Sequence, residues 1–393
     1  MAQERWAGTL REDDEAAAQV GPIELFFDLV YVLAVTQVTH RLLAHLTPRG
    51  VAETAVLLLA MWIGWINTTW TTNYFDTRHR RVRLVLLWVT FASLILSASI
   101  PGAFEGRGLP FAVALVALLV GGSGSLFVGL GHQHPLGPVI QRVLIWWVAL
   151  GVVWIAGGVA HGAARLALWV VAVVVTYAVT WLGFPLPRLG RSQTTDYTIE
   201  GAHIAERCYL FVTIALGESV LLTGSNFGTR PMTSRTGAAF LVAFLVTVAL
   251  WWIYFDRAED AGTQVMSEAD DPGRLGLIAY TFVHVPMVAG IIVAAAADEM
   301  TIEHPGAPTT LGAALAILGG PALYLAGHAA FKWTLWRRLS PSRFGGLAGL
   351  AALIPLAFVA SRVVLLGATC AVLLVVVVVD LWLERRTGAV HLT

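Results

Sequence analysis

The sequence predicts an all-α polytopic membrane protein with about 12 transmembrane helices, arranged as two parallel six-helix repeats. Two observations support this fold class. Hydrophobic residues make up 57% of the 393 residues and charged residues 13%, with a mean hydropathy of +0.73, values far from those of a soluble domain. Motifs in the first half of the chain also recur in the second half in the same order. The composition predicts the class, and the recurrence predicts its organisation.

The apolar runs are long enough to cross the hydrocarbon core, which takes about 20 residues of helix. Residues 1–21 are polar and acid-rich, so we expect a polar cytoplasmic N-terminus followed by a first helix that acts as an uncleaved signal. Twelve spans are predicted, near residues 22–45, 52–75, 82–101, 109–131, 138–160, 166–186, 199–223, 236–256, 274–298, 309–331, 345–361 and 363–383.

Four pairs of motifs indicate an internal duplication, with one repeat at 22–190 and the other at 198–386. Each pair is a weak match alone, but all four occur in the same order. The pairs are Glu24–Val38 with Glu206–Val220, Asn73–Asp76 with Ile253–Asp256, Gly121–His132 with Gly319–His328, and Arg165 with Arg362.

The basic residues predict the orientation of the spans. Of the 25 Lys and Arg residues, 17 fall on one side of the predicted spans and seven on the other, with Arg207 inside a span. Because cytoplasmic loops are enriched in Lys and Arg, both termini are predicted to be cytoplasmic. Six spans is an even number, so the two halves then have the same orientation, and the repeat is parallel rather than inverted.

Two groups of motifs resemble those of a known family. The run Ile23–Val32 with Thr36–Thr39 is similar to the opening signature of the bacterial low temperature requirement A (LtrA) family. The segments His203–Arg207 and Ala215–Val220 resemble its second signature. The resemblance covers essentially the whole chain. It implies a polytopic protein of the bacterial inner membrane, linked by the family name to growth in the cold, and implies no particular molecular activity.

Polar residues inside the predicted spans are the candidates for a functional site. A charged side chain at the centre of a membrane helix costs about 2.5–3.5 kcal/mol, so it normally faces a partner or a water-filled cavity. At about 100° per residue, polar residues form one stripe on the first span and one on the seventh, and the second span adds two more. The predicted ion- or substrate-binding residues are Glu24, Asp28, Gln37, Asn73, Asp76, His203, Glu206, Arg207 and Glu218.

This cluster has a structural and a functional interpretation. In the structural one, Arg207 neutralises Glu24 or Asp28, and the network holds the two halves together. In the functional one, the cluster binds an ion or exchanges protons, because its carboxyl groups outnumber Arg207. The sequence leaves both open.

Other sites are less well supported. The segment Glu200-x-x-His203-x-x-Glu206 occurs once, whereas a di-iron bundle needs two Glu-x-x-His motifs and two further glutamates, so no metal and no cofactor are predicted. An aromatic pocket lined by Trp65, Trp70 and Trp251 is an alternative site for an organic substrate. The zero net charge argues against a nucleic-acid partner,.

The leading predicted function is secondary transport of an unknown small solute or ion across the lipid bilayer, coupled to protons or cations. The alternative is a membrane enzyme or lipid-interacting envelope factor that supports growth at low temperature. The sequence shows no nucleophile–base pair, which disfavours an enzyme, and a structural scaffold ranks third. The oligomeric state stays open, a homodimer included.

Overall fold

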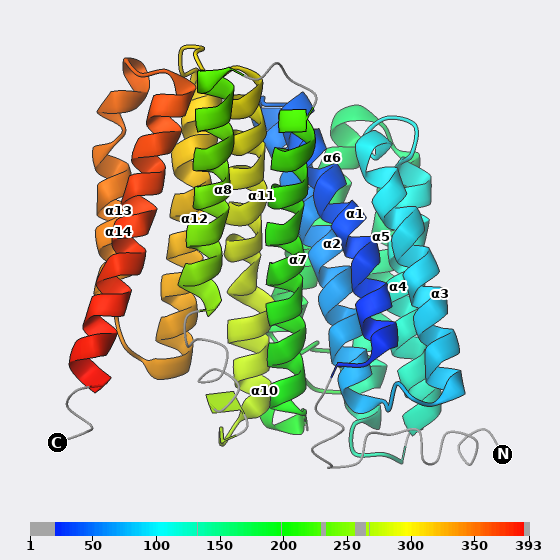
Figure 1. Ribbon diagram of the computed structural model, residues 1–393. Helices are drawn as coiled ribbons and strands as arrows, with labels where there is room; N and C mark the ends of the chain where they lie inside the picture. Colours follow the sequence, from blue (N-terminus) through cyan, green and yellow to red (C-terminus); the bar gives the residue numbers. More distant parts are fainter. Residues whose placement is uncertain are drawn as a thin grey trace. The chain divides into compact units, whose positions relative to one another are not determined.

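The structure, a computed structural model, describes residues 20–131, 133–197, 199–228, 233–255, 265–266 and 268–388 (Figure 1). Within these ranges it contains 12 helical segments that are long and apolar enough to cross a membrane, which confirms the predicted all-α class with about 12 spans. Nearly all of the predicted N-terminal segment 1–21, together with His132 and the Asp256 end of one repeat motif, lies outside the described residues.

The chain divides into two compact units, each described by itself. Unit 1 comprises Met1–Phe211 and Thr263–Thr281, and unit 2 comprises Val212–Gly262 and Phe282–Thr393. These boundaries reflect packing and do not test the proposed duplication at 22–190 and 198–386, which stays a prediction.

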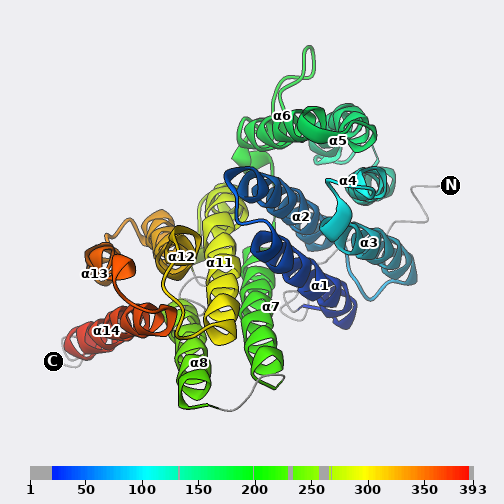
Figure 2. The same ribbon diagram turned by 90° about the horizontal axis from the view of Figure 1, so that it is seen from above.

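Unit 1 contains the first six spans and the beginnings of the seventh and the ninth. Its helices are α1 (Pro22–Ala44), α2 (Pro48–Tyr74), α3 (Arg80–Ser99) with the 3₁₀ turn η2 (Ile100–Gly102), α4 (Gly108–Leu130), α5 (Gly137–Val159), α6 (Gly162–Trp181), the 3₁₀ turn η3 (Thr194–Asp196), the start of α7 (Gly201–Gly228), α10 (Pro272–Leu275) and most of η4 (Gly276–Phe282). Viewed along the helices, α2 contacts α1, α4 and α6 (Figure 2). In the apolar stretch of α2, 72% of the residues are buried, the largest share among the twelve spans of the described chain. Helix α2 is therefore the centre of this unit.

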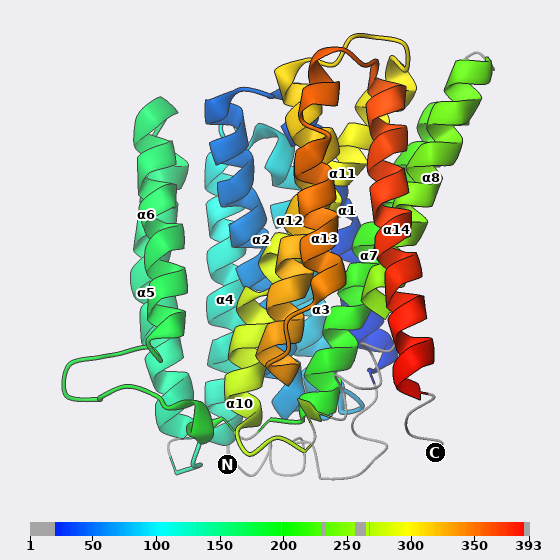
Figure 3. The ribbon, with the colours of Figure 1, turned by 90° about the vertical axis from the view of Figure 1, so that its left-hand side faces the viewer.

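Unit 2 contains the rest of the seventh and ninth spans and the other four spans. Its helices are the rest of α7, α8 (Ser234–Phe255), α11 (His284–Glu303), α12 (Leu311–Trp336), α13 (Pro341–Ala352) with the 3₁₀ turn η5 (Pro355–Phe358), and α14 (Arg362–Gly388). Helix α12 packs against α11 and α13, and α14 packs against α13 and α8 (Figure 3). Buried Arg343 ties these helices together, because it forms an ion pair with Asp380 and donates to His328 Nδ1 at 3.1 Å and to the Ile253 carbonyl at 3.1 Å.

Several helices begin at residues that satisfy free backbone N–H groups. Thr47 Oγ1 accepts from Gly50 N at 3.1 Å, directly before Pro48 opens α2, and Thr310 Oγ1 accepts from Ala313 N at 3.3 Å at the start of α12. Such caps contribute about 1 kcal/mol each, and proline at the first helical position loses no hydrogen bond.

The ninth span, Pro272–Glu303, is longer than predicted and contains a π-helical segment, η4. Pro286 lies four residues after Phe282 and has no N–H to donate to its carbonyl, so the regular α-helical ladder is interrupted where η4 ends,. The widened turn brings Thr281 against α2, where its carbonyl accepts from Trp62 Nε1 at 2.7 Å and its hydroxyl accepts from Trp70 Nε1 at 3.1 Å.

Arg165 and Arg362, matched by the predicted duplication, both donate to backbone carbonyls inside their own units. Arg362 Nη1, at the start of α14, donates to the Met300 carbonyl near the end of α11 at 3.0 Å. Arg165, near the start of α6, is 2% exposed and therefore needs its partners within the protein. It donates to five backbone carbonyls, those of Ala103, Glu105, Gly157, Gly158 and Ala160.

We expect Arg165→Lys to lower the stability of the protein in detergent by about 2–4 kcal/mol, because a lysine cannot reproduce the planar set of donors and each hydrogen bond to a charged group contributes about 1.5–3 kcal/mol. The measurement is the thermal unfolding midpoint. The control is Arg107→Lys, since the exposed side chain of Arg107 donates to the Ala98 carbonyl alone among the described residues and should change stability by less than about 0.5 kcal/mol. Equal midpoints for the two variants would contradict the structural role of Arg165.

Candidate functional site

Two carboxylates, a histidine and an arginine of unit 1 are completely buried. Glu24 and Asp28 lie one turn apart on α1, and His203 and Arg207 lie one turn apart on α7, each 0% exposed. The spacing of four residues places each pair on one helix face. Glu24 Oε1 lies 3.0 Å from His203 Nε2, and Arg207 Nη1 donates to Asp28 Oδ2 at 2.9 Å. The ion pair expected for Arg207 is therefore present, with Asp28 as its partner.

Aromatic residues complete the surroundings of the Asp28–Arg207 pair. Trp65 Nε1 donates to Asp28 Oδ1 at 2.8 Å. The Arg207 guanidinium lies 5.5 Å from the centre of the Trp65 ring and 5.8 Å from that of Phe27, distances at which a cation is attracted to a ring face. Arg207 Nε and Nη2 have no acceptor among the described residues, so this guanidinium keeps donors for water or a solute.

Asn73 of α2 determines which nitrogen of His203 carries the proton. The Glu200 backbone N–H donates to Asn73 Oδ1 at 2.9 Å, and Asn73 Nδ2 donates to the Glu200 carbonyl at 2.8 Å. This orientation directs Asn73 Nδ2 to His203 Nδ1, 3.3 Å away. Because Nδ2 is a donor, Nδ1 must accept, and the proton of neutral His203 is on Nε2, where it donates to Glu24.

The hydrogen bonds also indicate the charges. Glu24 Oε2 accepts from Gly21 N at 2.9 Å while Oε1 faces His203, and both Asp28 oxygens accept as well. Carboxyl groups that only accept are ionised. With neutral His203, the four buried groups therefore carry one net negative charge, and one added proton makes them neutral.

The other predicted site residues lie at varying distances from this cluster. Glu206 is partly buried beside it, and its Oε2 accepts from Val20 N at 3.1 Å. Gln37 lies nine residues after Asp28 on α1, about 13 Å along the helix, and Glu218 lies about 16 Å beyond Arg207, on the part of α7 that belongs to unit 2,. Within unit 1 the structure thus brings together Glu24, Asp28, Asn73, His203 and Arg207, and does not bring Gln37 to them.

Asp76 belongs to the loop after α2. It accepts from Arg78 N at 2.9 Å and Arg78 Nε at 3.0 Å. Burial raises the pKa of Asp76, but the hydrogen bonds and the charge of Arg78 lower it further, so the net pKa lies below its ordinary value. Asp76 is thus an ionised residue that organises its own loop.

The sequence does not predict the positions of two buried residues. Trp65 is predicted to line an aromatic pocket, whereas it donates to Asp28, because its position depends on how α1 and α2 pack. Asp298, on α11, is 2% exposed, and neither of its carboxyl oxygens has a donor among the described residues. The predicted ninth span ends at residue 298, which makes Asp298 the polar end of a helix. The apolar residues on both sides of it are the signal that could have placed it inside the span.

The twelve spans define an integral, multi-pass membrane protein. The family model described as "Bacterial low temperature requirement A protein (LtrA)" matches residues 19–378, so the chain belongs to this family, as the sequence motifs predicted. Uncharacterized protein RA0937 of Rhizobium meliloti (strain 1021) is 34% identical over 370 residues, which cover 94% of this chain and 90% of the relative. No solved structure matches the chain significantly.

We expect Asp28→Asn to destabilise the protein by about 3–5 kcal/mol, because it leaves the buried Arg207 guanidinium without an anionic partner. The measurement is thermal unfolding in detergent. The control is Asp76→Asn, which removes a carboxylate from a partly exposed pair and should cost no more than about 1 kcal/mol. If both variants unfold at the same temperature, the Asp28–Arg207 pair does not hold unit 1 together.

Asp298 is expected to be a neutral acid, because an ionised carboxylate without a partner is costly inside a membrane protein. Asp298→Asn should therefore change stability by less than about 1 kcal/mol and remove a carbonyl stretching band of a protonated carboxylic acid from the infrared spectrum. A large loss of stability with no change in that band would show instead that Asp298 is an ionised, paired group.

Proposed function

We propose that this protein is a secondary transporter of the bacterial inner membrane, with both termini in the cytoplasm, that couples the movement of a small solute to proton binding at Glu24 and His203. The observation that carries the proposal is the buried set of Glu24, Asp28, His203 and Arg207, whose charges balance when one proton is added. Burial favours a neutral set, and histidine is the type of side chain whose ordinary pKa lies closest to neutral pH.

Proton binding at this site has a structural consequence. On His203 the added proton goes to Nδ1, because Nε2 already carries one. Nδ1–H would then face the donor Asn73 Nδ2 at 3.3 Å, and two donors repel each other. Turning the Asn73 amide would remove this conflict but would break both hydrogen bonds to the Glu200 backbone. Protonation therefore weakens the contact between α2 and the start of α7, which is the kind of two-state element that coupled transport needs.

The alternative function, lipid interaction, has support of a different kind. Unit 2 contains an apolar groove of about 410 Å³ along α12, α13 and η5, lined mainly by aliphatic side chains. A groove of this shape suits an acyl chain. Because any lipid-facing surface can offer such grooves, this observation is less specific than the buried charge set, and we rank transport first.

Proton binding can be measured without knowing the solute. Proteoliposomes adsorbed on a solid-supported membrane and exposed to a pH jump should give a transient current as protons enter the buried site. We expect Glu24→Gln and His203→Gln to reduce the displaced charge at least fivefold, since each removes one of the two groups that hold the proton. Repeating the measurement with Na⁺ or K⁺ jumps at constant pH tests for a cation in place of the proton.

The matched control is Glu53→Gln. Glu53 is also a buried carboxylate of unit 1, paired with Arg41 at 2.8 Å and Arg49 at 2.8 Å, but it lies outside the site and should keep the transient current. If Glu24→Gln and His203→Gln retain the wild-type current and merely unfold at lower temperature, the cluster is structural and the transport proposal fails.

A further inference from the structure

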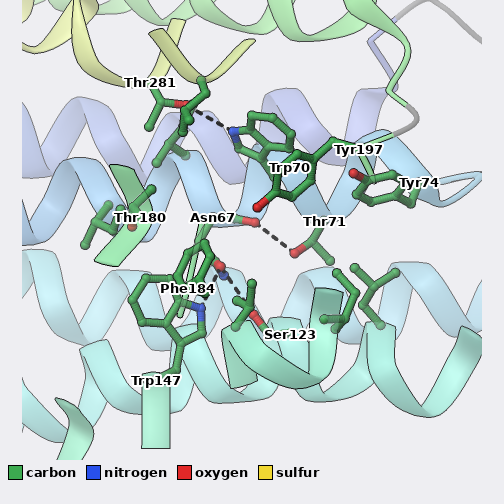
Figure 4. A pocket seen from close by; sticks show the side chains of 16 residues that line it. Asn67, Trp70, Thr71, Tyr74, Ser123, Trp147, Thr180, Phe184, Tyr197 and Thr281 are labelled. Atoms are coloured by element: carbon green, nitrogen blue, oxygen red, sulfur yellow. Dashed lines mark hydrogen bonds between the residues drawn. The ribbon is translucent and has the colours of Figure 1, made fainter. Parts of the chain in front are cut away.

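A cavity of about 80 Å³ lies within unit 1, on the side of α2 away from the charged cluster. It is bordered by α2, α4, α5, α6, the segment that follows α6, and η4. Figure 4 shows aromatic and uncharged polar side chains around it. The residues that matter for its chemistry are Asn67, Trp70, Tyr74, Ser123, Trp147 and Tyr197. Trp70 is the one member of the expected aromatic pocket that lines this cavity; Trp65 and Trp251 do not.

Two polar groups in the wall of this cavity lack hydrogen-bond partners in the described part of the chain. Asn67 is 9% exposed and Tyr74 is 8% exposed, and neither Asn67 Nδ2 nor the Tyr74 hydroxyl has a hydrogen-bond partner among the described residues. The orientation of the Asn67 amide is determined, because its Oδ1 accepts from Trp147 Nε1 at 3.0 Å and from Ser123 Oγ at 3.2 Å (Figure 4). Buried polar groups are nearly always paired, and leaving one unpaired costs about 1–3 kcal/mol.

We propose that this cavity binds a small, neutral molecule whose oxygen accepts a hydrogen bond from Asn67 Nδ2 and whose polar group also meets the Tyr74 hydroxyl. None of the side chains that line the cavity carries a charge at neutral pH, so a charged ligand would have no counter-ion there. At protein packing density, about 0.74, the cavity holds a molecule of roughly four heavy atoms. Small amides, ketones and alcohols meet these requirements.

Helix α2 connects this cavity with the charged cluster. At about 100° per residue, Asn67 and Tyr74 lie about 20° apart on the helix, and both lie about 100° or more from Trp65 and Asn73, which contact the cluster. A change in the position of α2 therefore affects both sites. The role of the cavity as the substrate site rests on the proposed transport function, whereas its binding of a neutral molecule does not.

Binding can be tested with acetamide as the probe and acetate as its charged counterpart of nearly the same shape. Saturation-transfer NMR on the purified protein in deuterated detergent should show transfer to acetamide and none to acetate. Tyr74→Phe should weaken acetamide binding at least fivefold and leave the unfolding temperature unchanged or higher, because it removes a hydroxyl that has no partner in the described structure. Gly122→Ala should weaken binding as well, since its new methyl group would lie 3.6 Å from Asn67 Nδ2.

Tyr177→Phe is the control for the loss of a tyrosine hydroxyl. Tyr177 donates to the Leu59 carbonyl at 3.0 Å and does not line the cavity, so this variant should lose stability and keep acetamide binding. Three results would each overturn the proposal. They are equal transfer to acetate and acetamide, unchanged binding in Tyr74→Phe and Gly122→Ala, and no transfer at all because the cavity holds only water. Acetamide binding without a proton current would defeat the transport function alone, and a proton current without acetamide binding would defeat the cavity proposal alone.

Discussion

The structure depends on one constraint, that a polar group inside a membrane protein must find its partner within the protein. The constraint is most severe for arginine, because its side chain cannot become neutral by releasing a proton. In unit 1, Arg165 is satisfied by five backbone carbonyls and Arg207 pairs with Asp28. In unit 2, Arg343 joins α8, α12 and α14 through the Ile253 carbonyl, His328 and Asp380. Buried guanidinium groups therefore link helices in each unit, in addition to apolar packing.

Function is proposed where the same constraint is incompletely met. Within the described residues, Arg207 keeps two N–H groups, Asn67 one amide nitrogen, and Tyr74 its hydroxyl without partners. Arg207 belongs to the charged cluster, which α2 contacts through Trp65 and Asn73, and the other two residues lie on α2 and line the cavity. Asp298 of unit 2 is a separate case, a carboxyl group whose surroundings contain no donor in the described structure. Unpaired groups of this kind are destabilising, so their presence needs water, a proton or a solute to explain it.

The twelve spans could be predicted from the sequence because hydropathy is a local property of each segment. The Asp28–Arg207 pair could also be anticipated, since helical spacing places each residue on a polar stripe and an arginine at this depth needs a carboxylate. The role of Asn73 could not, because it depends on the Glu200 backbone, which is 127 residues away in the chain. The cavity could not be predicted from the sequence either, because it is formed by the packing of side chains from several helices. Glu218 shares a helix face with Arg207, but a shared face does not measure distance along the helix axis.

The geometry of α2 allows an estimate of how strongly proton binding could act on the cavity. Converting the Asn73–His203 hydrogen bond into a contact between two donors removes an interaction and leaves a buried donor unpaired, a change of about 1–3 kcal/mol. Each 1.4 kcal/mol changes an equilibrium about tenfold, so in the proposed mechanism one proton would change an equilibrium between two positions of α2 by about 5- to 150-fold, the range usual for coupling between sites. Because Asn67 and Tyr74 are carried by the same helix, any movement of α2 changes the cavity in the same step. A single rigid helix that contacts both sites is thus sufficient for coupling, and no longer chain of residues between them is required.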